Sequence, residues 1–214
     1  MSDKELEARG LKIRYRANEI ALDAEHAKTD PVVLFHGQSF SLDNWYDIGT
    51  VDALSERGFP VYAIDLPSGR ASKSGKVSYE NVSEYVPILD SIFAKLKIGI
   101  SKPMIIVGPS MGGGFALAYS LARPQAVKAL VLIGPALHTL DVSSFKEIKV
   151  PVLLVWGERD EVFPLERFGN LLKEKLVNCK LVILKNAGHP AYLDKPKEFN
   201  EILLGFLEEI TRNA

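Results

Sequence analysis

Ser110 lies in the segment Gly108-Pro-Ser110-Met-Gly112, which matches the pattern G-x-S-x-G between an apolar run and a helical segment. A serine at such a strand-to-helix turn adopts a strained backbone that exposes its Oγ, and the flanking glycines let strand and helix pack closely. Met111 begins the predicted helix, so its N–H would face an anion forming at Ser110. The pattern predicts a nucleophilic serine; the alternative is a glycine-rich helix start with an exposed N-cap serine.

A histidine and a carboxylate at suitable positions could activate this serine. A hydroxyl is a weak nucleophile until a base takes its proton. Active sites of α/β proteins form at the carboxyl edge of the sheet, and His36, His138 and His189 all follow predicted strands. Asp160, which follows another apolar run, could fix the tautomer of an imidazole. The order Ser110, Asp160, His189 is the order found in one hydrolase architecture.

Six short apolar runs must position these residues. They are continuous rather than alternating, as in strands that are covered on both faces. Segments with helical periodicity lie between them, which predicts an α/β fold with a mostly parallel central sheet and helices on both faces. A preceding run at 11–16 alternates, which predicts an antiparallel edge strand. The apolar runs are 32–35, 61–64, 104–107, 129–133, 152–156 and 181–184, and the clearest helical segments lie within 82–96 and 199–210.

The composition is that of an ordinary folded protein. The chain has 214 residues, of which 47% are hydrophobic and 25% charged, and its formal net charge is −1. This length suits a single α/β domain spanning residues 1–214. A net charge near zero, without long runs of like charge, argues against nucleic-acid or anionic-membrane binding. We therefore expect a small-molecule substrate and a monomer or small homo-oligomer.

The sequence favours a cytoplasmic location. The opening segment MSDKELEARGLKIRYR is charged and lacks the apolar region of a secretory signal. The longest wholly apolar run, at 129–137, is far shorter than the roughly 18–20 residues of a transmembrane helix. The single cysteine, Cys179, cannot form an internal disulfide, and we interpret it as a structural thiol.

Five segments occur in the order found in α/β-hydrolase fold proteins: LFHGQSFSLDNW, AIDLPSGRASKS, VGPSMGGG, VWGERDEVFP and NAGHPAYLDKP. The chain therefore resembles this superfamily from about residue 30 to its end. Three of the segments, HGQSFSLDNW, DLPSGRASKS and GHPAYLDKP, are more narrowly similar to a small lidless group. That group includes the CIB-type proteins, the vertebrate α/β-hydrolase-domain 14 relatives. The resemblance implies an α/β-hydrolase fold without a cap domain.

The resemblance also implies roles for individual residues. Ser110 aligns with the family nucleophile, Asp160 with the acid and His189 with the base. The backbone N–H groups of Gln38, after the family's HG turn, and of Met111 would form the oxyanion hole.

The resemblance further implies that His36, in the family's HG turn, is a structural histidine whose ring hydrogen-bonds the neighbouring loop. Two departures from the family pattern leave questions open. The loop DLPSGRAS has one glycine, Gly69, where relatives often have two, so the shape of this loop is undetermined. Pro109 is an uncommon residue before the nucleophile, and its effect on the turn is also undetermined.

Only 137–149 separates the strands predicted at 129–133 and 152–156, which align with the sixth and seventh strands of the family, where many relatives carry a lid of tens of residues. A lidless pocket would be shallow and open. Residues that follow strand ends or neighbour the triad could line it, although ordinary packing of loop aromatics is an equal alternative. The predicted pocket residues are Phe40, Trp45, Leu137, His138, Phe163 and Tyr192.

Three functional interpretations follow. The first is a carboxylesterase that acts on small acyl esters through a Ser-His-Asp triad, with no metal or organic cofactor. The second, from the CIB-type resemblance, is removal of acetyl groups from protein lysines with acyl transfer to coenzyme A. The third is a ligand-binding or interaction module that keeps the fold without turnover. The reactivity of Ser110 discriminates the third from the other two.

Overall fold

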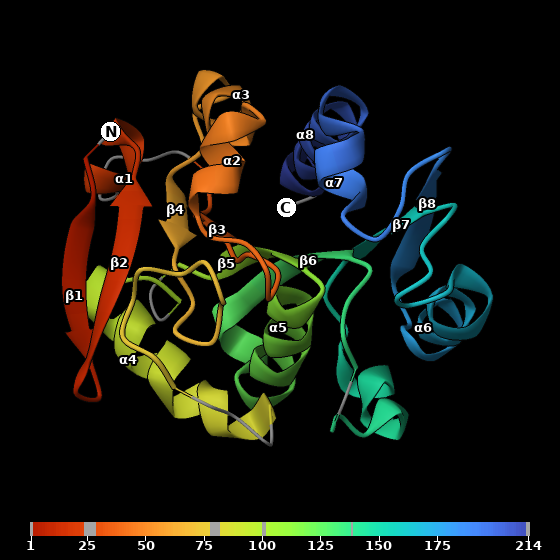
Figure 1. Cartoon of the computed structure of the whole chain (residues 1–214), viewed down its shortest axis with the longest axis horizontal. Coiled ribbons are helices and arrows are strands. Elements are labelled where there is room, and N and C mark those ends of the chain that lie inside the picture. The colour runs from red at the N-terminus through yellow and green to blue at the C-terminus, as the bar shows by residue number, and fades with distance from the viewer. Residues whose placement is uncertain (1, 24–28, 78–81, 100–101, 138, 213–214) are drawn as a thin grey trace.

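The computed structural model describes residues 2–23, 29–77, 82–99, 102–137 and 139–212. Its centre is an eight-stranded sheet with the strand order β1-β2-β4-β3-β5-β6-β7-β8 (Figure 1). The strands are β1 (Lys4–Ala8), β2 (Leu11–Ala17), β3 (Val32–Leu34), β4 (Val61–Ile64), β5 (Met104–Pro109), β6 (Val127–Ile133), β7 (Val152–Gly157) and β8 (Cys179–Leu184).

The sheet is mostly parallel, as predicted. Strands β4, β3, β5, β6, β7 and β8 pair in parallel, whereas β2 pairs antiparallel with both β1 and β4. The prediction of an edge strand at 11–16 is therefore wrong in its position, because β1 covers that edge. The sequence of β1, KELEA, is too charged to stand out as an apolar run.

At the other edge, β8 departs from the expectation of burial on both faces. It has a neighbour on one side only, and Ile183 is 43% exposed. An edge strand keeps one row of backbone groups unpaired in the sheet and is harder to cover completely.

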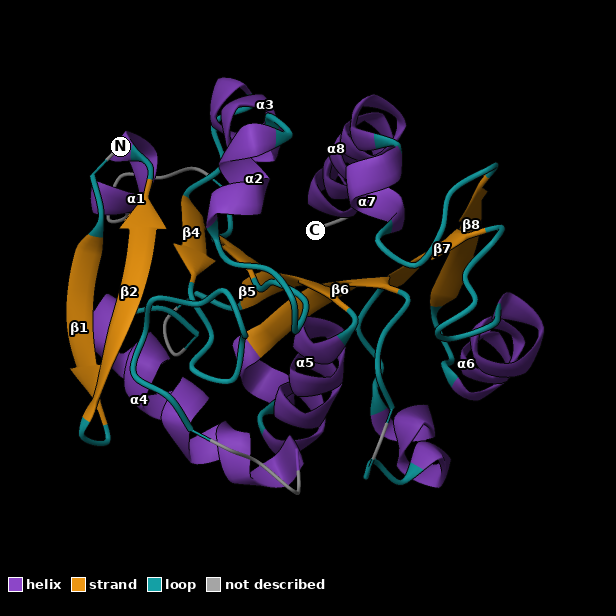
Figure 2. Ribbon diagram, in the orientation of Figure 1, coloured by secondary structure: helices purple, strands orange, loops and turns teal. Residues whose placement is uncertain are grey.

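Helices cover both faces of the sheet (Figure 2). In Figure 1, α2, α3, α7 and α8 lie on one side of the sheet, and α4 and α5 lie on the other. The helix predicted within 82–96 is divided into a 3₁₀ helix, Val82–Tyr85, and α4, and Pro87 lies in the first turn of α4, where a backbone N–H has no partner within the helix. The helices are α1 (Glu19–Leu22), α2 (Asp43–Asp47), α3 (Thr50–Glu56), α4 (Val86–Leu96), α5 (Met111–Ala122), α6 (Asn170–Lys175), α7 (Ala191–Asp194) and α8 (Pro196–Arg212).

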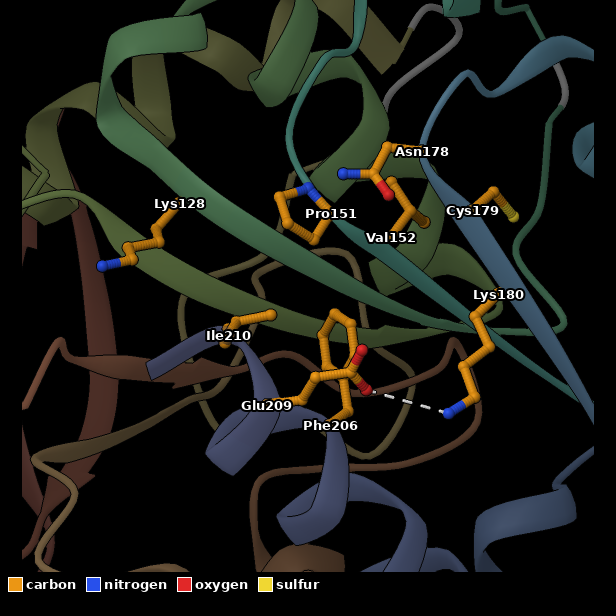
Figure 3. A pocket seen from close by; sticks show the side chains of 9 residues that line it. All are labelled: Lys128, Pro151, Val152, Asn178, Cys179, Lys180, Phe206, Glu209 and Ile210. Carbon is orange, nitrogen blue, oxygen red and sulfur yellow. Dashed lines mark ion pairs between the residues drawn. The ribbon is translucent and has the colours of Figure 1, made fainter. Parts of the chain in front are cut away.

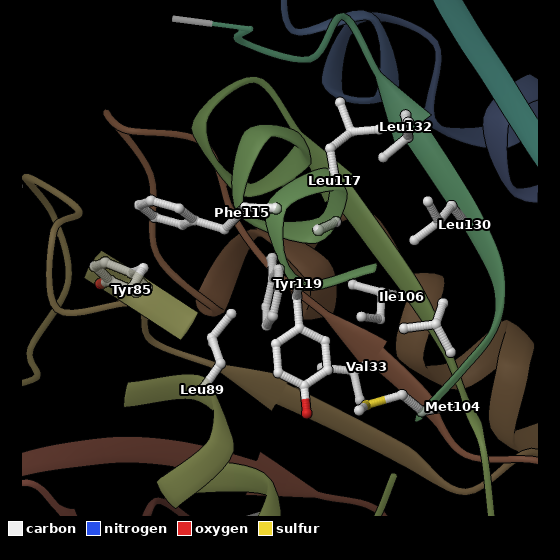
Figure 4. Packing of buried hydrophobic residues seen from close by; sticks show 14 of the residues in the cluster. Val33, Tyr85, Leu89, Met104, Ile106, Phe115, Leu117, Tyr119, Leu130 and Leu132 are labelled. Atoms are coloured by element: carbon white, nitrogen blue, oxygen red, sulfur yellow. The ribbon is translucent and has the colours of Figure 1, made fainter. Parts of the chain in front are cut away.

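Two apolar cores hold these layers together, one on each face of the sheet. Successive strand residues alternate between them, so that Ile106 of β5 belongs to one core and Val107 to the other. This explains the continuous apolar runs of the sequence. Figure 4 shows the core between the sheet and α5, where the rings of Tyr85 and Phe115 stack with centroids 3.8 Å apart.

The connection between β6 and β7 is short. Residues 134–151 link the two strands, and within their described part the only regular element is the 3₁₀ helix Val142–Glu147. The fold therefore carries no cap domain at this point, as the resemblance implied. None of the helices within the described ranges combines the length and hydropathy of a membrane span.

Candidate active site

The turn between β5 and α5 has the strained backbone that its sequence predicts. Ser110 has φ 49° and ψ −117°, a conformation that costs a non-glycine residue of order 1–3 kcal/mol. Three hydrogen bonds hold it: the Ser110 N–H donates to Ile133 O (2.9 Å), and Ser110 O accepts from the N–H groups of Gly114 (3.1 Å) and Ala136 (2.9 Å). These bonds fix the serine at the carboxyl edge of the sheet.

Any side chain at the glycines on either side of this serine would clash with neighbouring atoms. A Cβ on Gly108 would lie 2.6 Å from Gly112 O, and a Cβ on Gly112 would lie 2.8 Å from His36 O and from Phe35 Cβ. Real Cβ atoms do not approach other atoms so closely. The start of α5 therefore packs directly on the end of β3, which gives the G-x-S-x-G spacing its physical reason.

His189 and Asp160 form a hydrogen-bonded pair. His189 Nδ1 lies 2.8 Å from Asp160 Oδ2, and Asp160 is only 5% exposed. The other oxygen, Oδ1, accepts from the N–H groups of Val162 (2.9 Å) and Phe163 (2.8 Å), which fixes the carboxylate. Because an ionised carboxylate only accepts hydrogen bonds, the Nδ1 of neutral His189 carries its proton and Nε2 is left able to accept one.

Ser110 and this pair meet at the end of β6. Ser110 bonds to Ile133, and the next residue, Gly134, packs against the pair: a Cβ on Gly134 would lie 3.0 Å from Asp160 Oδ2 and 3.4 Å from His189 Cε1. The described hydrogen bonds include none between the Ser110 hydroxyl and the His189 ring. Catalytic hydrogen bonds often tighten only when substrate is bound. The structure thus brings the three predicted residues to one place.

The loop after β3 lies against the serine. A Cβ on Gly37 would be 3.6 Å from Ser110 Cβ, and Gln38 is the next residue. No described residue accepts the Gln38 N–H, and the N–H of Met111, the first residue of α5, has no partner within its own helix. Two backbone donors therefore stand beside Ser110. Gln38 O accepts from Arg70 N–H at 2.6 Å, a brace that sequence reasoning missed because it involves only backbone atoms.

His36 is a structural histidine, as predicted. Its buried ring accepts a hydrogen bond at Nε2 from Leu66 N–H (2.8 Å) and donates from Nδ1 to Gly37 O (2.8 Å). A Cβ on Gly69 would lie 2.3 Å from His36 Cε1. The one glycine of DLPSGRAS therefore leaves room for this ring, which answers the question that the sequence left open. Burial lowers the pKa of His36.

The predicted pocket residues divide into two groups. Trp45 and Tyr192 are fully buried with ring centroids 4.8 Å apart, and Leu137 is 5% exposed, so we correct these three to packing residues. Phe40 and Phe163 are partly exposed and remain candidates for the pocket wall; the Phe163 ring lies 5.3 Å from that of His189. His138, the sixth predicted residue, lies outside the described residues.

The indole of Trp45 replaces a backbone hydrogen bond that Pro109 cannot make. Ile105 N–H donates to Pro31 O and Phe35 N–H to Val107 O, a parallel ladder in which residue 109 would next donate to Phe35 O. Pro109 has no N–H to donate. Instead, the indole Nε1–H of Trp45 donates to Phe35 O at 2.9 Å. This is why an uncommon proline is accommodated directly before the nucleophile.

A separate cavity lies at the end of the sheet where the parallel strands begin, opposite the end that carries Ser110. It has a volume of about 490 Å³ and lies between the first residues of β6, β7 and β8 and the end of α8 (Figure 3). Across it, Lys180 Nζ lies 3.9 Å from a Glu209 carboxylate oxygen. Burial raises the pKa of the Cys179 thiol in its wall to about 11, which agrees with a structural thiol. None of the predicted site residues lines this cavity.

Comparisons with known proteins found similar sequences and a matching family. The model of the alpha/beta hydrolase fold family matches residues 30–147. Protein ABHD14A of Mus musculus is 33% identical over 192 residues, which cover 88% of this chain and 74% of that protein. "Putative protein-lysine deacylase ABHD14B" of Rattus norvegicus is 29% identical over 213 residues, which cover 98% of this chain and 97% of that protein.

Solved structures show the same fold. A predicted CIB-like hydrolase of Thermoplasma acidophilum superposes with a TM-score of 0.86 at 24% identity, covering 97% of this chain and 98% of that one. The carboxylesterase CesB of Bacillus subtilis superposes with a TM-score of 0.82 at 20% identity, covering 96% and 91% of the two chains. At these identities the likeness establishes the fold alone.

The Trp45 hydrogen bond makes a double-mutant prediction. Trp45→Phe leaves Phe35 O without its donor, which should cost about 1–3 kcal/mol beyond the change in packing. In a Pro109→Ala background, the new N–H can donate to Phe35 O, so the same Trp45→Phe change should cost about 1 kcal/mol less. Urea unfolding of the four proteins measures this coupling. Additive free energies of unfolding would show that residue 109 does not replace the indole.

His36 should make stability depend on pH. Because its pKa in the folded protein lies below the usual value near 6.5, the unfolded chain binds more protons as the pH falls. Stability that is present above pH 6.5 should therefore be lost below it, by at most about 1.4 kcal/mol per pH unit. His36→Gln keeps an acceptor for Leu66 N–H but does not titrate. Urea unfolding at pH 7.5 and 5.5 should show a smaller loss for the variant, and equal losses would contradict the role of His36.

Proposed function

The chain belongs to the α/β-hydrolase fold family and is of the ABHD14 type, and on this premise we propose that it is a serine carboxylesterase that acts on small acyl esters. One observation carries the proposal. Ser110 stands on a strained turn beside the N–H groups of Gln38 and Met111, neither of which donates to a residue in the described part of the chain. It also lies against the same β6 terminus as the His189–Asp160 pair, whose hydrogen bond is 2.8 Å long. This is the set of parts that acyl transfer requires.

In the first step, Ser110 Oγ attacks the ester carbonyl while His189 Nε2 takes the hydroxyl proton. The carbonyl oxygen becomes an oxyanion, which the N–H groups of Gln38 and Met111 stabilise. Asp160 stabilises the imidazolium. Collapse of the tetrahedral intermediate breaks the ester bond, His189 gives its proton to the leaving alcohol, and the acyl group stays on Ser110.

In the second step, water replaces the alcohol. His189 takes a proton from water, which adds to the acyl carbonyl, and the same two N–H groups hold the second oxyanion. The bond to Ser110 Oγ then breaks and Oγ recovers the proton from His189. The carboxylic acid leaves and the enzyme returns to its starting state.

The surroundings of Ser110 favour small substrates. The link from β6 to β7 carries one short 3₁₀ helix in its described part, and nothing there resembles the long apolar cover that encloses a fatty acyl chain. The partly exposed rings of Phe40 and Phe163 offer limited apolar surface. A short acyl group would gain most of the binding energy that such surfaces can supply.

Labelling with a fluorophosphonate tests the nucleophile directly. Wild type should gain one adduct per chain by intact mass, because the His189–Asp160 pair activates Ser110 toward the probe. Ser110→Ala should gain none, and Asp160→Asn should react about 10³–10⁴-fold more slowly, because its amide no longer stabilises the imidazolium. The exposed Ser143 provides a control, and Ser143→Ala should label like wild type. Folded wild type without an adduct would reject catalysis and leave a ligand-binding role.

A second candidate is transfer of acyl groups from protein lysines to coenzyme A. Two observations favour it: the likeness to ABHD14B extends over nearly the full length of both chains, and the short link from β6 to β7 leaves room for a bulky acyl donor. The chemistry differs in the acyl donor, an amide in place of an ester, and in the acceptor, a thiol in place of water. The lysine amide would acylate Ser110 and leave as the amine, and the thiol of coenzyme A would then take the acyl group in place of water.

Acceptor dependence separates the two candidates. An esterase should release acetate from para-nitrophenyl acetate without coenzyme A and leave an acetyl-lysine peptide intact. A deacylase of the second kind should remove the acetyl group from the peptide only with coenzyme A, and equimolar acetyl-coenzyme A should form. Mass spectrometry of both substrates, with and without coenzyme A and with Ser110→Ala as the blank, measures each product. Peptide deacylation and thioester formation in wild type would overturn the esterase proposal in favour of the second.

A further inference from the structure

Arg14 of β2 is buried under three carboxylates. Its side chain is 4% exposed, and each of its five N–H groups donates a hydrogen bond to an aspartate. Asp3 and Asp43 each receive two of these bonds, at 2.6–3.1 Å, and Asp65 receives one at 2.9 Å. No ammonium group could do the same, because lysine has three donors on one atom. Arg14 lowers the pKa of Asp43 to about 2.

Asp65, which is paired with Arg14, also accepts hydrogen bonds from the backbone of two loops. Its side chain is fully buried. Oδ1 accepts from Leu42 N–H (2.7 Å), at the end of the loop that begins at His36. Oδ2 accepts from Lys73 N–H (3.0 Å), within the loop that follows β4. Burial of this carboxylate is costly unless it is paired and hydrogen-bonded, and Arg14 supplies the opposite charge at 2.9 Å.

The loop from His36 to Leu42 is therefore fixed at three points. At its start, the His36 ring is bonded to Leu66 N–H, and at its end Leu42 N–H is bonded to Asp65. Between them, Gln38 O accepts from Arg70 N–H at 2.6 Å. Every partner belongs to the segment 65–70, which Asp65 joins to Arg14. Gln38 N–H, on the other side of the same residue, is one of the two donors beside Ser110.

We propose that Arg14 is a positioning residue for the oxyanion hole: through Asp65 and Asp43 it holds the loop His36 to Leu42 so that Gln38 N–H stays aimed at the developing oxyanion. This role rests on the proposed hydrolase function. It concerns a side chain of the N-terminal hairpin that touches neither substrate nor the reacting atoms. Oxyanion stabilisation acts mainly in the transition state, so loss of the role should lower kcat and leave KM nearly unchanged.

The test variant is Arg14→Lys, which keeps the charge but cannot make the five hydrogen bonds. Its matched control is Ile13→Val on the same strand, a buried apolar residue that lowers stability without touching the aspartates. Turnover of para-nitrophenyl acetate is measured per site labelled by the fluorophosphonate, so that unfolded protein is not counted. We expect kcat per labelled site to fall about 10- to 100-fold in Arg14→Lys, with KM within about twofold. Ile13→Val should keep the wild-type kcat.

Amide hydrogen exchange gives a second readout that does not need activity. The N–H groups of Leu42 and Arg70 should exchange at least about tenfold faster in Arg14→Lys than in wild type, while amides of α8 keep their rates. Unchanged kcat per labelled site, or unchanged exchange at these two amides, in a protein whose wild type is active would overturn the positioning role alone. A wild type that neither labels nor turns over ester would overturn the proposed function itself.

Discussion

The backbone of Ser110 is the constraint on which the rest of the site depends. A residue with φ 49° persists only when its surroundings over-determine it, and here β6, the start of α5 and the segment after β6 each supply one hydrogen bond. The same turn requires α5 to start almost in contact with the end of β3. That contact places the loop after β3, and with it Gln38 N–H, beside the serine. The strained backbone of Ser110, the close packing of α5 on β3 and the position of the proposed oxyanion donors thus depend on one another.

Local patterns were enough to find the residues proposed to do chemistry. Ser110, Asp160 and His189 each follow a strand, and the parallel sheet brings such positions to a single edge. The buried strands could also be predicted, because a strand that is covered on both faces has a continuous apolar sequence. The first strand of the N-terminal hairpin was harder to predict because β1 is charged, although it pairs with β2 through the two-residue turn Arg9-Gly10, where both residues have positive φ.

The residues that hold the site in place could not be found in this way. Arg14 and Asp65 are 51 positions apart, and their pairing exists only once the chain has folded. The brace from Arg70 to Gln38 uses backbone atoms, so no side-chain type signals it. Trp45 was predicted at the pocket because it follows a strand end, and Tyr192 because it neighbours His189 in sequence. Their full burial shows that closeness along the chain does not decide which way an aromatic ring faces.

The oxyanion donors that we propose beside Ser110 are backbone groups, which would separate catalysis from specificity. Gln38 and Met111 contribute N–H groups whose positions are set by the HG turn and by the start of α5, not by their side chains. The side chain of Gln38 is exposed and is therefore free to contact substrate without altering the donor. A loop that is fixed through its backbone can change its side chains, and hence its substrate, at little cost to the chemistry. Such a loop must in turn be held from outside, which is the role that the buried cluster of Arg14 and its aspartates can supply.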